Sequence, residues 1–163
     1  PYIQISEAFR RKQDTLHFIK KAEKDTLAVY KYPEGTLVDL NEADTTELKK
    51  IPGIGSGIAR MIVAYRKRLG GFYDMAQLKE VNYVDEDMLR WFKLGNAPIH
   101  RINANKAGLD KLRSHPYMNF YQAKVIIEYR RKKGKLKSLS QLSLYEEFTE
   151  KDLERLSHYL AFD

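Results

Sequence analysis

The chain has 163 residues, with 29 Lys and Arg against 22 Asp and Glu, so its net charge is +7 and its sequence pI is about 9.4. This length predicts one or two domains, and the basic balance favours a polyanionic partner. The absence of Cys excludes disulfides and thiolate metal sites, and no apolar run approaches the roughly 20 residues of a membrane span.

Residues 1–37 are predicted to form an N-terminal extension or linker. Positions 6–28 are rich in charge with sparse apolar residues, which is typical of either a helix or a solvated linker. Pro1-Tyr2-Ile3 resembles His158-Tyr159-Leu160 near the other end, which indicates the end of a truncated upstream repeat. Because the chain begins with Pro and not Met, we expect either a removed upstream anchor or export segment or, failing that, a cytoplasmic protein.

Two copies of one pattern follow, at 40–97 and 102–160, and we predict domains at 38–98 and 99–163. Late in the copies, matching residues are 64 positions apart: Tyr65 and Tyr129, Gly70 and Gly134, Leu78 and Leu142. Early in the copies, Asp44 is matched with Asn105 and Leu48 with Leu109, 61 positions apart. The change of offset predicts a three-residue insertion in the hairpin of the second copy.

Each copy is predicted to hold four short helices, and residues 36–39 to be extended. Polar residues suited to N-caps precede the helices: Asp44 and Asn105, Asp74 and Ser138, Asp85 and Thr149. Gly70-Gly71 and Gly134 lie where the long helices are expected to end. The predicted fold class is therefore all-α.

Residues 51–57 (Ile-Pro-Gly-Ile-Gly-Ser-Gly) lie between two predicted helices and carry the most specific signal. The three glycines permit a tight turn and leave no side chains in the way of a ligand. The next helix begins here, and its unpaired N–H groups and positive dipole end favour an anion. On a basic chain we expect a nucleic-acid phosphate; the alternative is a tight helix–helix turn without a ligand.

The wider pattern contains Leu40-Asn41-Glu42-Ala43-Asp44, Leu48, residues 51–55, Ile58-Ala59, Ile62, Tyr65-Arg66, Gly70, Phe72 and Leu78. It resembles the competence-type helix-hairpin-helix family, which includes DNA receptors of natural transformation and, in a related branch, an extrinsic subunit of photosystem II. The resemblance implies two tandem helix-hairpin-helix units that bind double-stranded DNA from the minor-groove side without sequence preference, in DNA uptake, repair or recombination. The alternative is a protein-interaction or structural module that has lost DNA binding.

The predicted phosphate-binding residues lie in the first hairpin and one turn beyond it: Gly53, Ile54, Gly55, Ser56, Gly57 and Arg60. Ser56 is also expected to cap the following helix. Basic residues predicted to support binding are Arg66, Lys67, Arg68, Lys124, Arg130, Arg131, Lys132 and Lys133. The helix dipole favours cations at these positions, but the six cations within 130–137 exceed that requirement.

The second hairpin, 114–119, replaces the glycines with Ser-His-Pro-Tyr-Met-Asn. Pro116 has no N–H and the side chains crowd the approach, so we interpret this hairpin as structural, with Tyr117 and Met118 filling a core between the repeats. Residual binding through Asn119, Gln122 or Lys124 is the alternative. The turns at 81–85 and 144–148 lack glycine and are also interpreted as structural.

No catalytic constellation is recognised in the sequence. The four histidines lack metal-ligand spacing, Asp74 and Asp85 suit caps, and the glycines of 53–57 do not fit a dinucleotide motif. We therefore expect a protein that is not an enzyme, with no cofactor, metal or small-molecule substrate. Double-stranded DNA is the expected partner, with protein partners as a further option.

Overall fold

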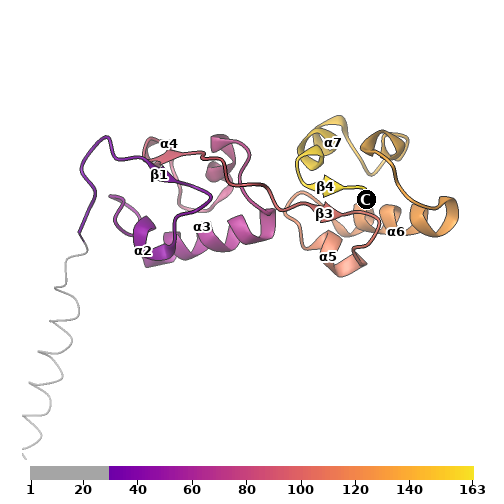
Figure 1. Cartoon of the computed structure of the whole chain (residues 1–163), viewed down its shortest axis with the longest axis horizontal. Coiled ribbons are helices and arrows are strands. Elements are labelled where there is room, and N and C mark those ends of the chain that lie inside the picture. Colours follow the sequence, from indigo (N-terminus) through magenta and orange to yellow (C-terminus); the bar gives the residue numbers. More distant parts are fainter. Residues whose placement is uncertain (1–29) are drawn as a thin grey trace, which may run out of the picture. The chain divides into compact units, whose positions relative to one another are not determined.

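The computed structural model describes residues 30–163, and the predictions made for 1–29 lie outside this part. Tyr32–Asp163 form one compact unit that contains both repeats (Figure 1). The first repeat runs through β1 (Val38–Asp39), α2 (Thr45–Leu48), α3 (Ser56–Leu69), the 3₁₀ helix η1 (Met75–Glu80), α4 (Glu86–Leu89) and β2 (Phe92–Lys93). The second runs through β3 (Ile102–Asn103), α5 (Leu109–Arg113), α6 (Phe120–Lys133), the 3₁₀ helix η2 (Leu139–Leu142), α7 (Glu150–Ser157) and β4 (Leu160–Ala161).

Short parallel strand pairs close each repeat. Val38 pairs with Phe92 in the first repeat, and Ile102 pairs with Leu160 in the second. Four helical segments per repeat are confirmed, but the all-α prediction is incomplete because of these strands. Strands of two residues are too short to produce the alternating pattern from which a strand is recognised.

Equivalent hydrogen bonds place the two repeats in one register. The Asn41 side chain accepts from the Phe72 N–H (2.8 Å) and donates to its carbonyl (2.9 Å). Asn105 makes the same pair of bonds with Leu136, at 2.8 Å each, 64 positions along the chain. The strands β1 and β3 also begin 64 positions apart, so the predicted insertion in the second hairpin is wrong.

The real length difference lies in the last helix of each repeat. The helix α7 has eight residues and α4 has four, so β4 begins 68 positions after β2. The predicted insertion depends on matching Asp44 with Asn105 as N-caps, and this match is wrong. Gly108, not Asn105, is the N-cap of α5, and Asn105 is occupied by the bonds to Leu136.

The N-cap predictions for Asp44, Asp74, Asp85, Ser138 and Thr149 are confirmed. Asp44 forms a capping box with Glu47, and Asp74, Ser138 and Thr149 form equivalent boxes, while Asp85 accepts from the Met88 N–H. Gly70, with φ of 93°, and Gly134, with φ of 87°, end the two long helices. The helix boundaries are therefore fixed by local hydrogen bonds, and the residues that make these bonds can be recognised in the sequence.

Each repeat has its own apolar core, and one residue of the second repeat belongs to the first. Tyr159 is fully buried among the residues of the first core. Its hydroxyl donates to the Gly71 carbonyl (2.8 Å) and accepts from the buried Gln77 amide (2.8 Å). Tyr117 packs against both cores, whereas Met118 lies in the core of the second. The two repeats are therefore joined by buried contacts.

Candidate nucleic-acid interface

Four hairpins in residues 30–163 share one backbone frame. In the first, the Ile51 N–H donates to the Leu48 carbonyl and the Ile54 N–H to the Ile51 carbonyl, at 3.1 Å each. The same two bonds recur in the hairpins at 81–85, 115–119 and 145–149. In every case the fifth residue is the N-cap of the next helix: Gly55, Asp85, Asn119 and Thr149 respectively. The hairpins therefore share one backbone frame and differ in their side chains, including the one at this cap.

The first hairpin leaves the start of α3 open. Gly55 has no side chain to cap the helix, and a Cβ at Gly55 or Gly57 would meet nothing within 4 Å. Among the described residues, the N–H groups of Gly55, Ser56 and Gly57 have no acceptor. Gly53 has φ of +84°, a left-handed conformation that favours glycine. These N–H groups are thus available to an external anion.

Two details of the predicted site are corrected. Ser56 is the first residue of α3 and not its cap, since Gly55 holds the cap position. Ile54 is buried and its N–H is bonded to the Ile51 carbonyl, so it supports the turn and has no amide to offer a phosphate. Arg60 is exposed on the second turn of α3, as predicted.

In the other three hairpins, side chains occupy the helix start. Asp85 accepts from the Met88 N–H at 3.0 Å, and its carboxylate repels a phosphate. Asn119 accepts from the Gln122 N–H (2.9 Å), and the Gln122 side chain accepts from the Asn119 N–H (3.0 Å). Thr149 accepts from the Asp152 N–H at 3.2 Å. Each of these caps satisfies donors that a ligand would otherwise use.

The second hairpin also contacts the first repeat through His115. The imidazole is 2% exposed; its Nδ1 accepts from the Tyr117 N–H (3.1 Å), so its Nε2 carries the proton and donates to the Leu69 carbonyl (2.9 Å). Burial lowers the pKa of His115 to about 4, and the nearby positive charges of Arg68 and Lys111 act in the same direction. A neutral His115 therefore joins the repeats, which supports the structural interpretation of this hairpin.

Bulky side chains at the start of α6 also make the second hairpin unsuited to phosphate binding. Phe120 and Tyr121 stand where the first repeat has Ser56 and Gly57, and their rings are 43% and 68% exposed. The alternative contacts proposed from the sequence are largely engaged: Asn119 and Gln122 cap α6, and the Lys124 ammonium lies 3.9 Å from the Glu128 carboxylate.

Several predicted supporting cations brace the fold. The Arg66 guanidinium donates to the Leu40 (2.9 Å) and Ala43 (2.8 Å) carbonyls, and burial lowers its pKa. Arg130 donates to the Ala107 carbonyl at 2.6 Å. Lys133 lies over the Tyr129 ring at 5.6 Å, and Lys132 lies 4.0 Å from Glu128. Lys67, Arg68 and Arg131 are exposed.

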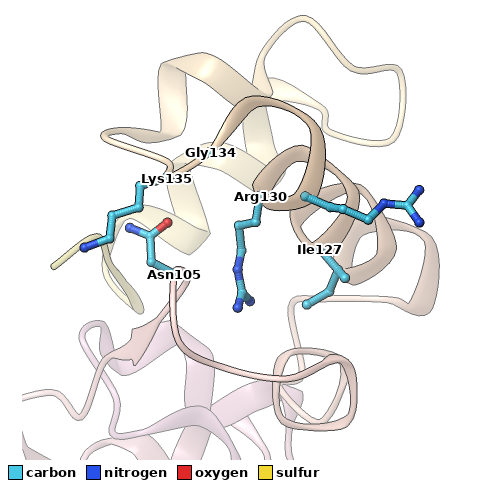
Figure 2. Close-up of a pocket in the computed structure, with 6 residues that line it drawn as sticks. Asn105, Ile127, Arg130, Gly134 and Lys135 are labelled. Carbon is cyan, nitrogen blue, oxygen red and sulfur yellow. The ribbon is translucent and has the colours of Figure 1, made fainter.

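A pocket of about 460 Å³ lies beside the end of α6, and Figure 2 shows Arg130 reaching from the helix into it. Its lining residues are Asn105, Ile127, Arg130, Arg131, Gly134 and Lys135. The equivalent pocket of the first repeat, about 340 Å³, is also lined by Ala97, Pro98 and His100 of the following segment. The His100 N–H donates to the Gly70 carbonyl there (2.8 Å). Both repeats thus have this pocket, and in the first repeat the segment at 97–100 packs against it.

The described residues contain no group of three or more potential metal ligands. Within the same residues, no helix is long and apolar enough to cross a membrane.

Residues 30–163 form a tandem repeat with one open helical hairpin, and comparison with protein families gives the class. The helix-hairpin-helix motif family matches residues 34–91 and 98–161, so the chain belongs to the helix-hairpin-helix family. The motif suggests nucleic-acid binding. The competence-type and photosystem branches named from the sequence stay predictions.

The chain is also similar to curated proteins called "Endonuclease/exonuclease/phosphatase family domain-containing protein 1". It is 27% identical over 154 residues to that of Mus musculus, covering 74% of this chain and 27% of the relative. It is 25% identical over 146 residues to that of Xenopus laevis, covering 74% and 26%. For Danio rerio the identity is 28% over 127 residues, covering 64% and 23%. The chain thus spans about a quarter of the length of these relatives, and no solved structure matches it.

Proposed function

We propose that this protein binds double-stranded DNA without sequence preference, and that the first hairpin holds a backbone phosphate. The observation that carries the proposal is the glycine cap of α3. Among the four hairpins of residues 30–163, this one leaves its helix start without a capping side chain. Backbone N–H groups at a helix start bind phosphate, and such contacts position a protein on a duplex without reading bases.

In this proposal Gly55, Ser56 and Gly57 donate to one phosphate through their N–H groups. The open space at Gly55 and Gly57 lets a phosphate approach the backbone closely. Arg60, exposed one turn further along α3, supplies a positive charge to the same or the next phosphate. Family membership and the net charge of +7 support a polyanionic ligand.

The test places a capping side chain at the open helix start. Gly55→Asn gives the first hairpin the cap of the second, and the extended φ of −95° and the free space accept it. We expect the affinity for a fluorescent random-sequence duplex, measured by anisotropy, to fall about tenfold, the loss expected for one or two charge-assisted hydrogen bonds.

Gly108→Asn is the matched control. Gly108 is also a glycine N-cap with no side-chain bond and open space around its Cβ position, but it begins α5 outside the hairpins. Both variants should fold with stability equal to or slightly above that of the wild type. Equal DNA affinity of the two variants would rule out the hairpin assignment.

A protein-interaction module is the second candidate function, favoured by the three hairpins whose helix starts are capped. The discriminating measurement is the anisotropy of the wild-type protein with the same duplex at two salt concentrations. Binding that weakens steeply with salt supports the DNA proposal. Absence of binding at low salt would favour the protein-interaction module.

We place this binding in DNA repair or recombination ahead of uptake, because the relatives are named for an endonuclease/exonuclease/phosphatase family domain. We further propose that the two repeats serve binding and not catalysis. Incubation of the protein with labelled duplex and divalent metal ions tests this: intact DNA is expected, and cleavage abolished by a repeat substitution would contradict it.

A further inference from the structure

A basic surface, separate from the first hairpin, lies where the two repeats meet. A groove of about 300 Å³ is lined by the end of α3, the segment at 100–102 and α5. Four of its lining residues are cations (Lys67, Arg68, Arg101 and Lys111), and no acidic residue lines it. We call these four residues and the space between them the junction groove.

The charges of the junction groove are not balanced by neighbouring carboxylates. All four side chains belong to exposed residues, and within residues 30–163 none of them forms an ion pair. The nearest acidic neighbour in sequence, Asp110, is paired with Arg113 at 2.9 Å. Like charges held together without counter-charges create a positive potential that attracts a polyanion.

The walls of the groove are held by the fold. His115 joins α5 and its hairpin to the Leu69 carbonyl, and the His100 N–H donates to the Gly70 carbonyl. Arg68 of the first repeat and Lys111 of the second both act on the buried His115, which indicates that their charges converge. The backbone positions that carry the cations are therefore fixed before any ligand arrives, which reduces the cost of binding.

We propose that the junction groove binds backbone phosphates of the same duplex that the first hairpin holds. This inference rests on the proposed function, since it adds a second contact to the DNA bound there. The groove adjoins the end of α3 and the hairpin its start, about 20 Å apart for 14 residues. That span equals about six base pairs at 3.4 Å per step, so one short duplex is long enough to reach both.

The experiment compares salt dependence. Arg68→Gln combined with Lys111→Gln removes one cation from each repeat, and Lys93→Gln combined with Lys151→Gln removes two exposed cations outside the groove. For a 20-base-pair random duplex we expect the junction variant to bind about five- to tenfold more weakly at low salt. Its slope of log affinity against log salt should flatten by about 2, since each lost phosphate contact removes about 0.9.

The outcomes separate the two proposals. Gly55→Asn should weaken binding at every salt concentration with little change of slope, because backbone amides release no counterions. If Gly55→Asn weakens binding while the junction variant matches its control, the groove inference fails and the hairpin stands. If the wild type binds no duplex, the proposed function itself fails. Polyglutamate is a polyanion without nucleotides. The nucleic-acid assignment would be overturned if polyglutamate bound the wild type but not the junction variant, while the junction substitutions left duplex binding unaffected.

Discussion

The hairpins at 51–55 and 115–119 occupy the same place in the two repeats, with the same backbone bonds, yet they face different surroundings. In the first, the fully buried Ile51 packs in the core and supports the turn, and Gly55 leaves the start of α3 without a capping side chain. In the second, His115 stands at the position of Ile51 and joins the other repeat, and Asn119 caps its own helix. Different side chains on one backbone frame thus separate an open helix start from an intramolecular contact.

The largest expected effect comes from removing the histidine of the second hairpin. His115→Ala leaves a cavity and strands the Tyr117 N–H and the Leu69 carbonyl without their partner. We expect the free energy of unfolding, from urea titration, to fall by about 3 kcal/mol. His100→Ala is the control, since its exposed side chain should be replaceable with less than about 0.5 kcal/mol of loss. Equal effects of the two would contradict the bridging role.

Acidification tests the same contact without substitution. The folded pKa of His115, about 4, lies below its ordinary value of 6.5, so the unfolded chain takes up the proton first. The stabilisation is complete above pH 6.5 and is lost as the pH falls towards 4, amounting to about 3 kcal/mol. Urea titrations between pH 7 and 4 should show this loss, and His115→Gln should reduce it. An unchanged pH profile in His115→Gln would assign the effect to other groups.

Removing the capping side chain of the second hairpin tests the comparison of the two hairpins in the opposite direction. Asn119→Gly removes the cap of α6, and we expect a stability loss of a few tenths of a kcal/mol. DNA affinity should not rise, because Phe120 and Tyr121 still crowd the helix start where the first hairpin has Ser56 and Gly57. Anisotropy with the random duplex measures this. A gain in affinity would mean that the cap alone closes the second hairpin.

A modest effect is expected for Arg60, which in the proposed function adds a positive charge beside the first hairpin. Arg60→Ala should weaken duplex binding about two- to threefold and flatten the salt slope by about 1. Lys151→Ala on α7 provides a control of equal charge change. Identical slopes in both variants would remove Arg60 from the site.

Much of the local structure follows from the sequence. Capping residues such as Asp44, Asp74 and Thr149 mark helix starts, and Gly70 marks a helix end, because their hydrogen bonds span only a few residues. The repeat and the first hairpin are visible for the same reason. The strand pairs were not predicted in full, since each joins residues more than 50 positions apart.

The sequence by itself determined the repeated helical units, their caps and the glycine hairpin at 51–57. Only the tertiary structure decided the constant register of the hairpins, the burial of His115 and the entry of Tyr159 into the first core. It also brought Arg68 beside Lys111 across the junction between the repeats. Caps and turns are set by neighbours within one helical turn, whereas these contacts depend on how two packed repeats meet, and no local pattern encodes that.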